Sequence, residues 1–206
     1  MQAITDLIMY FHKGGLVMWP LLACSITVIA IAIERFIYYK SVDSGAAFAS
    51  RYCAAVRSGD FAVATELARK GSGQCAQMLA DVAAIAGGKA EKSAFLESRA
   101  GIFMATLRDK LDYLGIIVTM SPLLGLLGTI VGMIGAFSIF NVEAGAPMAI
   151  TGGIGEALIA TATGLCVAIL SLCAHSYFAH RMDNMITDME QCFSALLEAE
   201  TRRGRS

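Results

Sequence analysis

The feature that most constrains this chain is a long stretch, residues 114–140, in which no side chain carries a charge. A helix needs about 20 mostly apolar residues to cross the hydrocarbon core of a bilayer, so this stretch is long enough to span one. Residues 14–34 are also apolar and end at Glu34, and residues 154–178 carry Glu156 near their beginning. The sequence therefore predicts three transmembrane helices and an all-α membrane fold.

The composition agrees with a membrane protein and argues against several other functions. Charged residues make up 16% of the 206 residues, against about 25% in soluble domains. The formal net charge is −1 and no block of Lys and Arg is present, so nucleic-acid binding is not expected. The six cysteines form no CxxC pair and no Cys/His ligand spacing, and no nucleophile with a base is recognisable. We therefore expect no metal, no cofactor and no enzymatic activity.

The distribution of Lys and Arg predicts the orientation of the three spans, because loops rich in these residues stay in the cytoplasm. Cations are frequent in residues 35–113 and present in residues 179–206, whereas residues 141–153 have none. The N-terminus is therefore expected outside the cell membrane and the C-terminus inside. Residues 141–153 then form a short outer loop between the second and third spans.

Most of the chain outside the membrane is expected to form helical cytoplasmic extensions. Residues 35–113 are rich in alanine, lack proline and are interrupted by short glycine-containing segments, which predicts a domain of several helices. Its last helix, from about residue 89, is expected to run unbroken into the second span. The third span is expected to continue into a helical tail, residues 179–206. Residues 1–13 have apolar side chains at helical spacing, which predicts an amphipathic helix on the outer membrane surface, with a frayed terminus as the alternative.

Glycines in the second span recur three and four residues apart. They are Gly125, Gly128, Gly132 and Gly135. Because positions with this spacing share one face of a helix, the pattern predicts a stripe at which another backbone approaches closely. Gly164 belongs to a similar face of small residues in the third span. Pro122, which lacks an amide donor, predicts a kink or a local opening in the second span.

Three polar side chains inside the spans are candidates for an ion pathway. Thr129 and Thr161 each lie about 11 residues from the outer loop, which places both hydroxyls at about the same depth, roughly 16 Å in. Glu156 lies near the outer end of its span, where a carboxylate is either functional or simply favoured by the helix N-terminus. Each threonine also has a structural alternative, a hydrogen bond to a carbonyl of its own helix. Because a hydroxyl cannot hold a proton, a titrating group at mid-membrane would have to come from another chain.

The two segments that carry these residues, 121–134 and 153–165, closely resemble the paired signature of the MotA/TolQ/ExbB proton-channel family. Three spans rather than four place the resemblance closest to ExbB/TolQ-type subunits. It implies a homopentamer around a central pore that holds a dimer of a single-span partner similar to ExbD or TolR, whose membrane aspartate takes up and releases protons. In that family the motif threonines face the pore near this aspartate; they correspond to Thr129 and Thr161 here, and the motif glutamate corresponds to Glu156.

The resemblance also implies a function. The subunit would lie in the bacterial inner membrane and use the proton motive force to energise a periplasm-spanning protein similar to TonB or TolA. An ExbB-like role in TonB-dependent transport across the outer membrane is the first interpretation, and a TolQ-like role in outer-membrane integrity or a non-conducting scaffold are the alternatives. The transported substrate, the ion (H⁺ or Na⁺) and the branch stay open. One departure is Ser121, which precedes Pro122 where many relatives have alanine.

Overall fold

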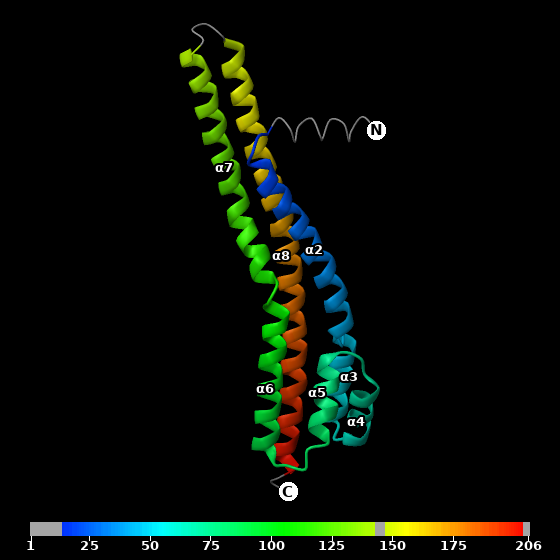
Figure 1. Ribbon diagram of the computed structural model, residues 1–206. Coiled ribbons are helices and arrows are strands. Elements are labelled where there is room, and N and C mark those ends of the chain that lie inside the picture. Colours follow the sequence, from blue (N-terminus) through cyan, green and yellow to red (C-terminus); the bar gives the residue numbers. More distant parts are fainter. Residues whose placement is uncertain (1–13, 143–146, 204–206) are drawn as a thin grey trace. The chain divides into compact units, whose positions relative to one another are not determined.

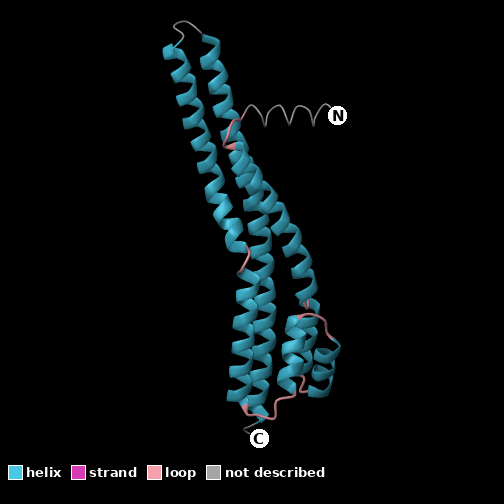
Figure 2. Ribbon diagram, in the orientation of Figure 1, coloured by secondary structure: helices cyan, strands magenta, loops and turns pink. Residues whose placement is uncertain are grey.

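The computed structural model describes residues 14–142 and 147–203, and these residues form seven helices and no strand (Figure 1, Figure 2). Three helical stretches are long and apolar enough to cross a membrane. They are Met18–Arg57, Lys89–Ser138 and Gly152–Arg202. The predicted all-α fold with three helices able to span a membrane is therefore confirmed. The outer-surface helix expected at residues 1–13 lies outside the described residues.

The chain divides into two compact units. Unit 1 contains residues 1–33 and 112–176, and unit 2 contains residues 34–111 and 177–206. The division crosses the long helices, so that α2 (Met18–Val42) and α8 (Pro147–Arg203) each contribute residues to both units.

Unit 1 is a bundle of the first part of α2, α7 (Leu111–Val142) and the first part of α8. Helices α7 and α8 lie antiparallel and side by side (Figure 1). Large apolar side chains remain exposed on their outer faces, for example Leu123, Ile134 and Leu158. A continuous apolar exterior of this kind is typical of a surface covered by lipid or by neighbouring chains.

Six helical segments make up unit 2. They are the end of α2, α3 (Ala46–Arg57), α4 (Phe61–Lys70), α5 (Gln74–Ala83), α6 (Lys89–Arg108) and the part of α8 from residue 177. Gly59 adopts a positive φ of 82°, which lets the chain turn after α3. Asp60 Oδ1 then accepts a hydrogen bond from Val63 N–H at 3.1 Å and caps α4. Two cysteine side chains meet in the interior of unit 2, where Cys53 Sγ lies 3.9 Å from Cys192 Sγ.

Two connections differ from the sequence prediction, and one agrees with it. Helix α6 ends at Arg108 and α7 begins at Leu111, so the expected unbroken rod is interrupted. Side chains of α2 bond to the carbonyls at the end of α6, which replaces the backbone donors of a continuous helix. The connection between α7 and α8 is shorter than the expected residues 141–153, because α7 reaches Val142 and α8 starts at Pro147. The expected helical tail is confirmed, since α8 is a single helix of 57 residues.

Candidate functional site

Glycines of α7 form a tight seam with α8. A Cβ atom built on Gly128 would lie 2.5 Å from the Cβ of Ala160, closer than two such carbons approach in real proteins. Gly125 and Gly132 are nearly as crowded, because a Cβ there would lie 3.0 and 3.2 Å from atoms of α8. Close packing of the two backbones therefore depends on the absence of side chains at these three positions.

The seam continues on α8 at Gly164 but does not include Gly135. A Cβ on Gly164 would lie 2.6 Å from the carbonyl oxygen of Ser121. A Cβ on Gly135 would have no neighbour within 4 Å among the described residues. The structure thus brings four of the five predicted packing glycines together and leaves Gly135 away from this contact.

The two candidate threonines make different hydrogen bonds. The Thr161 hydroxyl donates across the seam to the carbonyl oxygen of Gly125 at 3.0 Å. The Thr129 hydroxyl donates to the carbonyl oxygen of Leu126 in its own helix at 2.6 Å. Both hydroxyl protons are therefore used on backbone carbonyls, while each oxygen keeps lone pairs that can accept a further hydrogen bond or contact a cation.

The hydrogen bond from Thr161 also fixes the register of α7 against α8. It places Thr161 level with Gly125, whereas Thr129 lies one turn further along α7, about 5 to 6 Å toward the outer connection. The two hydroxyls are therefore offset by about one helical turn rather than level. Counting residues from the loop assumed that the two helices pack without an axial shift, and the bond from Thr161 to Gly125 shows that they are shifted.

Glu156 lies against the chain segment that leads into α2. Its Oε1 is so close to Gly15 that any side chain at residue 15 would overlap it. Gly15 also has a positive φ of 72°, a conformation that favours glycine. Val17, two residues later, is buried near Gly128 of the seam. The start of α2 therefore meets α7 and α8 near the Glu156 carboxylate.

Helix α7 is incompletely hydrogen-bonded at Pro122 and at Ser121 beside it. Pro122 lies inside α7 and has no amide to donate to the preceding turn. Ser121 beside it is fully buried, and its Oγ has no hydrogen-bond partner among the described residues. Ser171 of α8 is equally buried, but its Oγ donates to the carbonyl oxygen of Leu114 at 2.9 Å. Of these two buried serines, Ser171 has a hydrogen-bond partner, whereas Ser121 has none among the described residues.

Comparison with known proteins identifies the family of this sequence. Residues 72–191 match the sequence model of the MotA/TolQ/ExbB proton channel family. The matched range is more than half of the chain and contains α7 together with its seam on α8. The chain belongs to this family.

Individual relatives point to the ExbB/TolQ-type members of the MotA/TolQ/ExbB family. The biopolymer transport protein ExbB-like 3 of Synechocystis sp. is 31% identical over 164 residues, which cover 77% of this chain and 78% of the relative. The biopolymer transport protein exbB1 of Vibrio cholerae is 27% identical over 183 residues, 85% of this chain and 80% of the relative. The Tol-Pal system protein TolQ of Pseudomonas aeruginosa is 36% identical over 81 residues, 39% of this chain and 35% of the relative.

Three contacts of this ExbB/TolQ-type chain were not predicted from its sequence. They are the approach of Gly15 to Glu156, the hydrogen bond from Ser171 to Leu114, and the polar cluster around Arg35. Of these contacts, only the one at Gly15 could have been recognised from the sequence, because a pair of glycines directly before an apolar span indicates close packing. Ser171 and Arg35 resemble ordinary residues of a span and of its end, and their partners lie more than 50 residues away in the chain.

Proposed function

We propose that this chain is the channel-forming subunit of an inner-membrane assembly driven by the proton motive force. Five copies surround a central pore that holds a dimer of a single-span partner similar to ExbD or TolR. The assembly passes work to a periplasm-spanning protein similar to TonB or TolA. The membership of the chain in the MotA/TolQ/ExbB proton channel family carries this proposal, and relatives named as biopolymer transport proteins support it.

The absence of a titratable group at mid-membrane supports the need for a partner. Residues 114–140 contain no charged side chain, and Glu156 lies toward the outer end of the third span. A proton path through the assembly therefore requires a carboxylate from another chain, which a membrane aspartate of the partner supplies. Each proton that crosses a potential of 100 mV releases about 2.3 kcal/mol, enough to bias a conformational step of that partner.

The threonines act in this proposal as acceptors rather than donors. Because the hydroxyl protons of Thr129 and Thr161 bind backbone carbonyls, the free lone pairs of both oxygens are available to a hydronium ion, a water molecule or Na⁺. Glu156 contributes negative charge near the outer end of the pathway. In the proposed orientation the N-terminus is outside and the C-terminus inside, which is supported by the absence of cations in residues 141–153.

One observation favours a second candidate, a membrane scaffold that does not conduct. Both threonine hydroxyls already have a structural partner, and the glycine seam accounts for the remaining small residues. In that case the two hydroxyls stabilise helices only. Conduction and scaffolding differ in what happens when the hydroxyls are removed without changing the shape of the side chains.

The deciding experiment is proton flux in liposomes that contain this chain and its single-span partner, measured with an enclosed pH-sensitive dye. The double variant Thr129→Val with Thr161→Val should lower the flux at least fivefold while native mass spectrometry still shows the pentamer. Thr163→Val is the matched control, because Thr163 donates to Ile159 of its own helix. Wild-type flux in the double variant, together with flux that survives asparagine at the partner's membrane aspartate, contradicts the proposal. Replacing Na⁺ by K⁺ in the same assay distinguishes H⁺ from Na⁺ transport.

A further inference from the structure

The junction between α6 and α7 is an interruption that the local sequence does not require. Helix α6 ends at Arg108 and α7 begins at Leu111, yet residues 102–114 contain neither glycine nor proline. Asp109, inside the junction, has helical backbone angles, φ −40° and ψ −51°. The backbone is therefore close to the conformation of a continuous helix.

The apolar pattern also continues through the junction. Phe103, Leu107, Leu111 and Leu114 follow each other at intervals of four, four and three residues, and all four are buried. This spacing is that of one face of a single helix. Sequence and burial thus favour a continuous rod, and the cause of the interruption must lie outside the junction.

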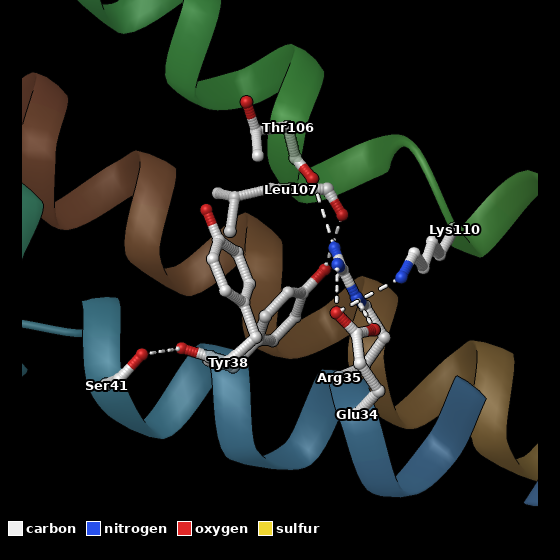
Figure 3. Close-up of polar contacts among 8 residues, drawn as sticks. Glu34, Arg35, Tyr38, Ser41, Thr106, Leu107 and Lys110 are labelled. Atoms are coloured by element: carbon white, nitrogen blue, oxygen red, sulfur yellow. Dashed lines mark hydrogen bonds and ion pairs between the residues drawn. The ribbon is translucent and has the colours of Figure 1, made fainter. Parts of the chain in front are cut away.

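Two side chains of α2 bond to carbonyl groups at the end of α6. Arg35 Nη1 donates to the carbonyl oxygen of Thr106 at 3.1 Å (Figure 3). Tyr39 Oη donates to the carbonyl oxygen of Leu107 at 2.8 Å. In a continuous helix each of these carbonyls would accept from the amide four residues further along the chain. The α2 side chains therefore supply donors in place of the backbone amides.

The Arg35 side chain is itself held in place on several sides. Its Nε and Nη2 atoms bond to the two carboxylate oxygens of Glu34 at 2.7 and 2.8 Å, and the same carboxylate lies 3.3 Å from Lys110 Nζ (Figure 3). The guanidinium carbon lies 4.7 Å from the centre of the Tyr38 ring. Arg35 is only 4% exposed and is the one buried charged residue among those the structure describes. A buried guanidinium with this many partners has little freedom to move.

We propose that Arg35 and Tyr39 form a clamp that holds a two-state joint between α6 and α7 in its interrupted state. With the clamp in place, α2 satisfies the two carbonyls and the first amides of α7 lack a helical acceptor. When the clamp is released, the nearest donors for these carbonyls are the amides one turn further on, and the joint closes into a continuous helix. All the side chains and carbonyls of the clamp lie in unit 2. This inference does not depend on the proposed function.

Hydrogen exchange of the full-length protein in lipid nanodiscs tests the clamp, with fragmentation that resolves single amides. The key variant is Tyr39→Phe, which removes one hydroxyl and keeps the ring that packs edge-on against Phe178 at 5.7 Å. We expect the amides of residues 110–113 to exchange at least tenfold more slowly in this variant than in the wild type. Arg35→Met should change the same amides in the same direction.

The matched control is Tyr38→Phe, one residue away, which keeps the ring beneath Arg35 and does not touch the hydroxyl bonded to Leu107. Its amides at residues 110–113 should exchange at the wild-type rate. Protection of the α8 amides at residues 185–192 reports in every variant whether unit 2 is folded. Unchanged or faster exchange at residues 110–113 in a folded Tyr39→Phe variant overturns the proposal, because the hydroxyl then only anchors the end of α6.

Discussion

The hydroxyl of Thr161 on α8 donates to the carbonyl oxygen of Gly125 on α7 at 3.0 Å, and the Cα of Thr161 lies 3.0 Å from where a Cβ of residue 125 would be. One side chain therefore bridges the two helices at a point where their backbones approach closely. Any role of Thr161 in conduction is combined with this structural one, and a stability measurement separates the two.

Thr161→Val should destabilise the folded protein, whereas Thr163→Val should not. Thr161 loses a hydrogen bond between helices, which contributes about 0.6 to 1.7 kcal/mol in membrane proteins. Thr163 loses only a bond to Ile159 of its own helix. The measurement is unfolding by SDS titration in mixed micelles. Equal stabilities of the two variants would mean that the bond across the seam contributes nothing.

The glycine seam predicts opposite effects of one substitution at two positions. Gly128→Ala places a Cβ 2.5 Å from Ala160 and should weaken the α7–α8 contact, with a lower unfolding midpoint. Gly135→Ala meets open space within this subunit and should raise helix stability by about 1 kcal/mol through alanine's better helix propensity. Native mass spectrometry of both variants adds the oligomer. Loss of the oligomer in Gly135→Ala alone would assign residue 135 to a contact between subunits.

Two buried serines offer a test of the unpartnered hydroxyl in α7. Ser121 and Ser171 are both 0% exposed, but among the residues that the structure describes only the Ser171 hydroxyl of this pair has a partner, the carbonyl oxygen of Leu114. Ser171→Ala should cost about 1 kcal/mol, while Ser121→Ala should be neutral or stabilising because it removes a buried hydroxyl without a hydrogen bond. Denaturant titration of the two single variants measures the difference. A larger loss in Ser121→Ala than in Ser171→Ala would reveal a partner for Ser121 supplied by another chain.

Features of the fold that are set within one helix can be predicted from the sequence, whereas features set by contacts between distant residues cannot. The apolar length of residues 114–140 and the spacing of Gly125, Gly128 and Gly132 are properties of single helices, so both can be recognised in the sequence. The interruption after Arg108 could not be predicted, because residues 102–114 favour a continuous helix and the donors that replace the ladder come from Arg35 and Tyr39, about 70 residues away.

The same distinction applies to side chains whose surroundings are set by tertiary packing. The sequence does not indicate that Cys53 and Cys192, 139 residues apart, bring their sulfur atoms to 3.9 Å. Nor does it indicate that Cys75 is buried as well. Helix length and spacing are therefore reliable in this chain, whereas exposure of single polar or sulfur atoms requires the folded structure.

The ion pair between Lys92 and Glu200 in unit 2 should matter more than the pair between Lys70 and Glu66. The first joins α6 to α8 at 2.7 Å, and its side chains are 14% and 22% exposed; those of the second are 78% and 62% exposed. Lys92→Met leaves a mostly buried carboxylate without its partner and should cost about 2 to 3 kcal/mol, below the range for completely buried pairs because some solvent reaches it. Lys70→Met should leave the unfolding midpoint almost unchanged, because water screens an ion pair this exposed. Thermal unfolding of both variants compares them, and similar midpoints would show that solvent screens the inner pair as well.

Unit 2 should lose stability in alkaline solution because of its buried thiols. Burial, with the neighbouring Cys192 as a smaller cause, raises the pKa of Cys53 from 9.0 to about 11. The unfolded chain then releases the Cys53 proton near pH 9 while the folded chain keeps it to about pH 11, so the contribution of Cys53 to the free energy of unfolding is constant below pH 9 and falls between pH 9 and 11. Burial also raises the pKa of Tyr52, so Cys53→Ala should reduce the slope of the unfolding midpoint against pH without abolishing it. A Cys53→Ala profile identical to that of the wild type would mean that the Cys53 thiol ionises equally in the folded and unfolded chain.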